Sequence, residues 1–446
     1  MGRAAMMRAY RNGLLWVLAC TAISILWGAS IGLSRAAWLD FRAVYAGTRC
    51  LMSGHNPYSV SDLAREYASE DGQRPSDPPW AQQSVTLYVN MPTAFVFVAP
   101  FAALPWTEAC ALWMLLTGGA LIAAIFLTWS IGARVAPDVA TILACLFAVN
   151  CEAIFCAGNT AGLVVGFCVI GVCCLLYERW VWLGVLFLGL GLAVKPHDAG
   201  LIWLYFLLAG GVHRKRALQS LLITVVIGVA GVLWVAHVSP HWIQDWSANL
   251  AAISAPGGIN EPSPDSLTGH ASSPVIDLQA AISVFRNDPR FYNAVSYLIC
   301  VPLLAWWAVR VMRSRFSRAG AWLGLAAASA QSMLITYHRP WDAKLLMLAI
   351  PPCCVLWAER SRRGKITFAI TATAVLLAGD IPLTILKTIA DALPGSETGF
   401  GGQLLTLALR RPESIALLAM GAYFLWLYGK SNAGGDSEAG PAAASS

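Results

Sequence analysis

Apolar runs of about 20 residues recur along the chain, and they constrain the fold more than any other feature. A helix needs about 20 apolar residues to cross a hydrocarbon core, whereas the strands of a membrane barrel are shorter and alternate. Charged residues make up 12% of the sequence, about half of what soluble domains carry. The pattern predicts an all-α, polytopic membrane protein. The net charge of +6 lies in short clusters between the runs and does not indicate nucleic-acid binding.

The basic residues predict how the chain is oriented. The positive-inside rule assigns four short basic clusters to the cytoplasm. Two long polar loops, at about residues 34–90 and 239–290, contain more acids than arginines and are predicted to be extracytoplasmic. The four clusters are Arg3, Arg8 and Arg11; residues 213–216; Arg313, Arg315 and Arg318; and Arg360, Arg362, Arg363 and Lys365.

Thirteen apolar segments are expected to build the membrane part of the fold. Six of them lie between the first external loop and the cytoplasmic cluster at 213–216, where an odd number of crossings is required. The candidates for a segment that does not cross are 91–104, which is short and bounded by prolines, and the region 180–211, broken at Pro196. We therefore expect about twelve crossings. The segments lie at about 13–33, 91–104, 106–131, 139–157, 159–177, 180–195, 197–211, 217–238, 291–311, 319–336, 344–358, 366–390 and 412–428.

The two ends of the chain have different expected roles. The first apolar run is not followed by a small-residue cleavage site, so we interpret it as a retained helix rather than a signal peptide. Residues 431–446 are mostly Gly, Ala and Ser and are expected to form a disordered cytoplasmic tail. Residues 1–430 then form one membrane domain. Most cysteines lie inside apolar runs and are interpreted as small hydrophobic residues, and no Cys/His spacing suggests a metal site.

Asp40 is the residue that most directly suggests a function. It lies in the stretch 38–45, just after the first apolar run, at the predicted external surface. An enzyme that works from outside on a lipid-linked substrate would hold a base at this place. The alternative is that Asp40 only caps the helix that begins there. Its position alone leaves both interpretations open.

Three further polar groups lie in or beside apolar segments, where ionisable side chains are unfavourable and are candidates for function. The group at 337–344 is predicted to be external, and its cations suggest an anionic partner such as phosphate. Each group has a structural alternative: an interhelical hydrogen bond, a lysine that snorkels to the interface, or a turn that pairs Arg339 with Asp342. The groups are Asn150, Glu152 and Asn159; Lys195, His197 and Asp198; and His338, Arg339, Asp342 and Lys344.

These groups, in this order, resemble the glycosyltransferase C superfamily, and most closely family 87, the polyprenyl-phosphate-mannose-dependent transferases. The resemblance covers about residues 13–360. The late loop departs from the pattern, because it has Tyr-His-Arg-Pro-Trp-Asp where members often have Ser-Trp-Asp/Glu-His. The matching stretches are Asp40-Phe41-Arg42-Ala43-Val44-Tyr45, Gly54-His55-Asn56-Pro57-Tyr58, Tyr88-Val89-Asn90-Met91-Pro92, Gly158-Asn159 and Leu192-Ala193-Val194-Lys195-Pro196.

The resemblance implies a helical bundle in a bacterial inner membrane, with two long loops above an extracytoplasmic cavity. A sugar, mannose by family default, would move from a polyprenyl-phosphate donor to a hydroxyl on a lipid or glycan acceptor, with inversion. Asp40 would be the general base, and Lys195, His338 and Arg339 would stabilise the leaving phosphate. Neither a cofactor nor a metal is expected. The expected substrate-binding residues are Arg42, Tyr45, Tyr58, Asn159, His197 and Asp342.

A transporter or flippase for a lipid-linked glycan is the alternative from another class. In that case the charged loops would be gates and Asp40 a coupling residue. Alternating access needs polar groups on both membrane faces, whereas the predicted polar set lies on one. The sequence also shows no repeat of its first half in its second, which many transporters have. Both observations favour an enzyme.

Overall fold

The computed structural model describes residues 3–32, 38–69, 79–263, 266, 274–393 and 399–433, and every regular element in these ranges is a helix. The elements are α1 (Arg3–Gly32), α2 (Leu39–Met52), α3 (Val60–Ser69), α4 (Pro79–Thr86), α5 (Pro92–Ala102), α6 (Trp106–Ala133), α7 (Pro137–Val149), α8 (Glu152–Ala157), α9 (Thr160–Leu176), α10 (Val181–Val194), α11 (Pro196–Leu208), α12 (Gly211–Val238), α13 (Trp242–Ser254), α14 (Leu278–Ser283), α15 (Pro289–Arg313), α16 (Arg318–Ile335), the 3₁₀ helix η1 (Asp342–Ala349), α17 (Ile350–Ala358), α18 (Arg362–Leu377), α19 (Asp380–Ala392), α20 (Gly399–Arg410) and α21 (Pro412–Ala433).

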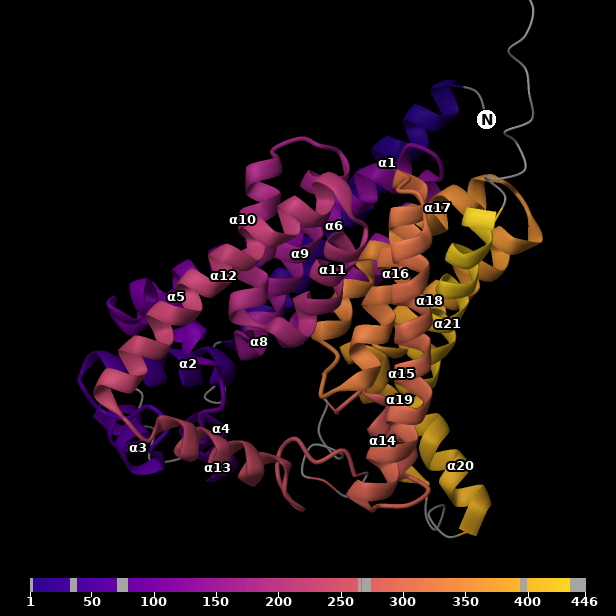
Figure 1. Ribbon diagram of the computed structural model, residues 1–446. Helices are drawn as coiled ribbons and strands as arrows, with labels where there is room; N and C mark the ends of the chain where they lie inside the picture. Colours follow the sequence, from indigo (N-terminus) through magenta and orange to yellow (C-terminus); the bar gives the residue numbers. More distant parts are fainter. Residues whose placement is uncertain are drawn as a thin grey trace, which may run out of the picture.

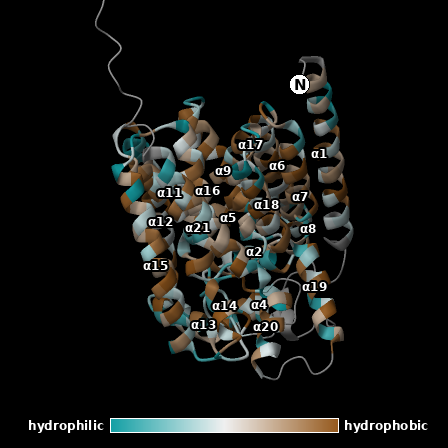
Figure 2. Cartoon of the chain, turned by 90° about the vertical axis from the view of Figure 1, so that its right-hand side faces the viewer, coloured by the Kyte–Doolittle hydropathy of each residue, from teal (hydrophilic) through white to brown (hydrophobic). Residues whose placement is uncertain are grey.

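Upright helices form a bundle whose two ends differ (Figures 1 and 2). The short helices α4, α13, α14 and α20 lie at its lower end in both views, and α1 begins at its upper end. Helices α13 and α14 belong to the polar stretch 239–290, and α2, α3 and α4 to the polar stretch 34–90. In its described parts the first predicted external loop is therefore largely helical, and the second is about half helical.

Within the described ranges, five helices are long and apolar enough to cross a membrane: α1, α6, α12, α15 and the stretch Pro137–Ala157 that contains α7 and α8. A sixth span results if α18 and α19, bent by 69° at a short break, count as one. The chain is thus a polytopic membrane protein. The count of about twelve crossings is not confirmed, because segments such as 180–195 and 197–211 form helices of 14 and 13 residues.

Lipid contact explains why large apolar side chains are exposed on several of the long helices. Leu26 of α1, Leu233 of α12 and Leu298 of α15 are 71%, 64% and 75% exposed. In hydrocarbon such side chains are solvated by lipid, so exposure does not destabilise the fold as it would in water. The main core lies between α6, α7, α9, α11, α16 and η1, and a second cluster packs α2 against α5 and α6.

Several helix boundaries differ from the sequence-based expectations. The segment 344–358 begins as the 3₁₀ helix η1, and the segment 366–390 is divided by the bend before Asp380. Helix α20 was not expected. Helix α21 continues to Ala433, so the first residues of the predicted tail are helical, and residues 434–446 lie outside the described ranges.

Candidate active site

One cavity of about 720 Å³ brings together polar groups that are far apart in the sequence. Asp40 of α2, Asn159 at the start of α9, and Lys195 and His197 at the α10–α11 break all line it. Its remaining walls come from α13, α15, the chain around Asp277, and the loop before η1. Each of the three polar groups predicted from the sequence therefore contributes at least one residue to this site. Asn159, Lys195 and His197 line the cavity, and the group at 337–344 lies mainly behind its wall.

Asp40 does not cap its helix. The N-cap residue of α2 is Trp38, whose φ of 68° is left-handed, and Asp40 lies in the first turn. Its Oδ2 accepts a 2.7 Å hydrogen bond from Nδ2 of Asn159. The carboxylate therefore bonds across to another helix instead of to its own backbone.

The pair Gly158-Asn159 explains how this contact is fixed. Gly158 ends α8 with a φ of 64°, and a Cβ there would lie 2.8 Å from atoms of both Trp38 and Phe41. Only glycine tolerates that conformation without strain. Asn159 then caps α9, because its Oδ1 accepts from the N–H of Ala161 at 2.7 Å. With its oxygen engaged, the side-chain amide has only its NH₂ group to offer Asp40.

The environment of Asp40 suits a base. Burial raises the pKa of Asp40 above its ordinary value, although the Asn159 hydrogen bond and the charges of Arg339 and Lys195 oppose this. A carboxylate whose pKa is raised toward neutrality accepts a proton more readily than an ordinary one. Asp40 can therefore take a proton from a hydroxyl group in the cavity.

Lys195 places a fixed positive charge on the cavity wall. It lies between α10 and α11, where Pro196 occupies the first position of the second helix. Its Nζ is 3.2 Å from Oδ2 of Asp198 and bonds Oδ1 of Asp342, and both carboxylates are fully buried. Two carboxylates thus compensate for removing the ammonium group from water, and the charge remains available at the cavity.

His338 lies behind Lys195 and is fully buried. Its Nε2 is 3.2 Å from Oδ1 of Asp198, and its Nδ1 is 2.8 Å from the carbonyl oxygen of Thr336. Both contacts suit a ring that carries two protons. Burial alone would lower the pKa of His338, but the hydrogen bond to Asp198 and the carboxylate charges raise it.

The same cluster has the donor types of a metal site. Ligand atoms of His197, Asp198 and His338 lie within 4.8 Å of one another. Oxygen and imidazole ligands of this kind suit a divalent transition metal. However, the ammonium of Lys195 is 3.2 Å from the same carboxylate and would repel a second cation at that point. The described geometry therefore fits a lysine-centred ion network better than a metal.

Arg339 is directed into the surrounding protein. Its guanidinium donates to the carbonyl of Ile259 at 2.6 Å and to Oδ1 of Asn260 at 3.2 Å, and it also bonds the hydroxyl of Tyr337. The backbone N–H of Arg339 donates to Oδ2 of Asp342 at 2.8 Å. Arg339 therefore fastens the chain near residue 260 to the loop before η1, and its charge acts on Asp40 from behind the wall.

Four of the six predicted substrate-binding residues lie behind the cavity wall instead of lining it: Asp342, which bonds Lys195 there, and Arg42, Tyr45 and Tyr58. Arg42 is buried, with its guanidinium 4.6 Å from the ring of Trp106. The hydroxyl of Tyr45 donates to the carbonyl of Leu104 at 2.7 Å, and that of Tyr58 donates to the carbonyl of Asn90 at 2.8 Å. These side chains pack α2 and the following loop against α5 and α6.

Several polar lining residues were not singled out from the sequence. Asp277, Gln279, Asn260 and Asn293 all line the cavity. The first three belong to the polar stretch 239–290, where amides and acids are expected at any solvated surface, so composition gives no signal for them. Asn293 lies near the start of α15, inside the expected apolar segment 291–311, and its polar side chain there was a signal that could have been used. The aromatic residues Trp246, Tyr292 and Trp341 also line the cavity.

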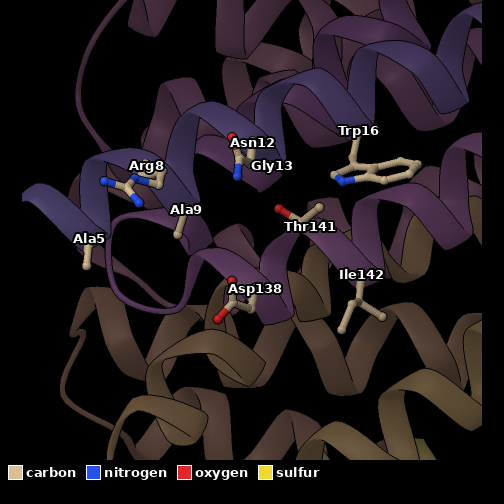
Figure 3. A pocket seen from close by; sticks show the side chains of 9 residues that line it. All are labelled: Ala5, Arg8, Ala9, Asn12, Gly13, Trp16, Asp138, Thr141 and Ile142. Carbon is tan, nitrogen blue, oxygen red and sulfur yellow. The ribbon is translucent and has the colours of Figure 1, made fainter.

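A second hollow, of about 680 Å³, lies between the first half of α1 and the start of α7 (Figure 3). Arg8, Asn12 and Asp138 point toward it. Arg8 and Asp138 are the charged residues among its described lining, and the rest is mostly small or apolar. It contains an acid and an amide, but its described lining includes no lysine, and no hydrogen bond joins Asn12 to Asp138 as Asn159 is joined to Asp40 in the larger cavity.

The sequence model of a family described as glycosyltransferase family 87 matches residues 88–337, which is more than half of the chain. The matched stretch contains Asn159, Lys195, His197 and most of the cavity wall, begins after Asp40, and ends just before His338. A search of curated proteins gave no match.

Proposed function

The chain belongs to glycosyltransferase family 87 and is a membrane glycosyltransferase, and from this membership we propose that it transfers a sugar from a polyprenyl-phosphate donor to a hydroxyl acceptor. The sugar is mannose, the default of the family, and the acceptor is a lipid or a glycan. Transfer takes place on the extracytoplasmic face of a bacterial inner membrane. This orientation is supported by the position of the cavity, which is bordered by the two polar loops.

One observation carries the proposal: a base and a fixed cation share one cavity wall. Asp40 is held by Asn159, and Lys195 is held by two buried carboxylates. Transfer from a lipid phosphate needs both groups. The attacking hydroxyl must lose a proton, and the departing phosphate oxygen gains negative charge.

The reaction proceeds by a single displacement. The acceptor oxygen attacks the anomeric carbon from the face opposite the phosphate, and its proton passes to a carboxylate oxygen of Asp40. The bond between the anomeric carbon and the phosphate oxygen breaks, and the oxygen keeps the bonding electrons. The anomeric configuration is therefore inverted. Lys195 stabilises the lipid phosphate that leaves, and His338 and Arg339 add positive charge from behind the wall.

The test is transfer of labelled mannose from polyprenyl-phosphate-mannose to a membrane extract by purified wild type and Asp40→Asn. The substitution keeps the shape of the side chain and removes the base. We expect transfer to fall by more than about a hundredfold, with donor binding and thermal unfolding unchanged. Asp62→Asn is the matched control, because Asp62 pairs with Arg65 on α3 and does not line the cavity. Equal transfer by wild type and Asp40→Asn would contradict the role of Asp40.

A further inference from the structure

The described lining of the cavity contains a second carboxylate, Asp277, that the proposed displacement does not use. Asp277 is only 2% exposed. It caps α14, with Oδ1 accepting from the N–H of Ala280 at 2.8 Å. Burial raises the pKa of Asp277 to about 6, against the opposing effect of that cap and of the nearby charges of His338 and Arg411. A helix cap alone does not require a buried carboxylate, because an exposed Ser or Asn caps equally well.

The backbone on either side of Asp277 is held more firmly than a loop usually is. The N–H of Ile276 donates to the carbonyl of His338 at 2.9 Å. Buried Arg411, just before α21, donates to the carbonyls of Val275 and Ser263 at 3.3 Å and 3.2 Å. Ser414 donates to the carbonyl of Asp277 itself at 2.8 Å. The carboxylate is thus fixed in position relative to the ion network of Lys195 and His338.

The groups around Asp277 have the chemistry of a sugar-binding wall. Gln279, Asn260 and Asn293 offer amides that both donate and accept, and Trp341 and Tyr292 offer flat apolar faces. A pyranose presents hydroxyl groups around its edge and C–H groups on its faces, so it matches this combination. A phosphate does not, because Asp277 would repel it. This wall therefore differs in its ligand from the wall that carries Lys195.

We propose that Asp277, together with Gln279 and Asn293, binds the hydroxyl groups of a pyranose ring and determines which sugar the cavity accepts. The proposal rests on the proposed function. The ring belongs either to the donor or to the acceptor glycan, and the chemistry of recognition is the same for both. Asp277 is a specificity-determining residue and takes no part in bond making.

The test compares wild type with Asp277→Asn, which keeps the size of the side chain and an oxygen that can cap α14. The second variant is Gln279→Ala, and the control is Asp391→Asn, an acid on α19 that pairs with Arg410 and is 48% exposed. We expect KM for one sugar substrate to rise by about tenfold or more, with kcat within about threefold. A rise in the donor KM assigns the subsite to the donor sugar, and a rise in the acceptor KM assigns it to the acceptor. A purely structural role would lower thermal stability and leave both KM values in place.

Binding of methyl α-mannopyranoside is measured separately by saturation-transfer NMR, because it does not depend on transfer. We expect binding to wild type to weaken by about tenfold or more in Asp277→Asn and to be unchanged in Asp391→Asn. If wild type transfers no sugar but binds the mannoside through Asp277, the proposed function fails and the subsite stands. Unchanged KM values together with mannoside binding that is absent or independent of Asp277 would overturn the subsite.

Discussion

The side-chain amide of Asn159 donates a 2.7 Å hydrogen bond to Oδ2 of Asp40 while its oxygen caps α9 through the N–H of Ala161. One side chain thus links the start of a core helix to the acid on α2. Because both ends of the amide are engaged, neither Asn159 nor Asp40 can rotate without breaking a hydrogen bond. The orientation of the acid is set by the capping geometry of a different helix.

Asn159→Ser separates these two roles. Serine caps a helix about as well as asparagine but has no amide to donate to Asp40, so we expect stability near that of wild type. The Asn159 hydrogen bond lowers the pKa of Asp40, and its loss raises that pKa further. Since the base works only when ionised, the acidic limb of the kcat/KM profile should move to higher pH. A profile that stays in place would show that this bond does not tune the base.

Gly158→Ala is expected to destabilise the protein and to reduce transfer. A left-handed φ alone costs an alanine about 1 to 2 kcal/mol, and here the new methyl would also meet Trp38 and Phe41. Gly54→Ala is the matched control, because Gly54 has a φ of 76° with nothing within 4 Å of the added Cβ. Unfolding by denaturant in detergent should show the larger loss at Gly158. Equal losses of stability in the two variants would mean that Trp38 and Phe41 move away from the added methyl group at no cost.

Lys195→Met removes the ammonium group that pairs with the buried carboxylates of Asp198 and Asp342, and in the described structure only Asp198 keeps a cationic side-chain partner, His338. Breaking a buried pair in this way costs about 3 to 5 kcal/mol, and losing a charge that stabilises the leaving group lowers kcat by about a hundredfold or more. Adding Asp342→Asn to this variant should restore part of the stability and none of the activity. Lys365→Met, on the exposed side of α18, is the control for losing a lysine. If the double variant regained transfer, Lys195 would be structural only.

The predicted orientation can be tested across a single helix. Lys215 lies near the start of α12 and Ala255 beyond its end, and both are exposed. A maleimide that does not cross membranes should label Ala255→Cys in cells with a permeable outer envelope, and Lys215→Cys only after the inner membrane is opened. The wild-type chain, with its own cysteines, gives the background. Labelling in the reverse order would place the cavity on the cytoplasmic face.

The sequence predicts helix positions best where proline marks the beginning of a helix. Pro137, Pro196, Pro289 and Pro412 each begin a helix within about two residues of the expected segment, because proline fits the first turn, where its missing N–H is not needed. The division between α18 and α19 could not be found in this way. It depends on Asn150, whose side chain approaches Gly379 and accepts from the N–H of Ile381, 231 residues away. The hydrophobic periodicity of the local sequence does not predict a contact between residues so far apart.

In the candidate site, too, some residues could be predicted from the sequence and others could not. Asp40, Asn159 and Lys195 could be identified because each is a polar residue beside an apolar segment. A polar side chain is unfavourable at that depth, so its presence there suggests a function. Their partners were harder to assign. His338 and Arg339 were predicted to stabilise the leaving phosphate, but they lie behind the wall, where Asp198 and the carbonyl of Ile259 contact them. Asp277 lies in a polar stretch and becomes conspicuous only when its burial is known.

Arg411 and Ser414, which fasten the chain around Asp277, lie at the very beginning of α21. During synthesis the ribosome makes Asp40 some 370 residues before it makes this anchor, at a pace of about 5 to 20 residues per second. For most of that time the cavity lacks the contacts that hold the chain around Asp277. The wall that carries Asp277 can therefore be completed only at the end of synthesis, when the start of α21 has been made.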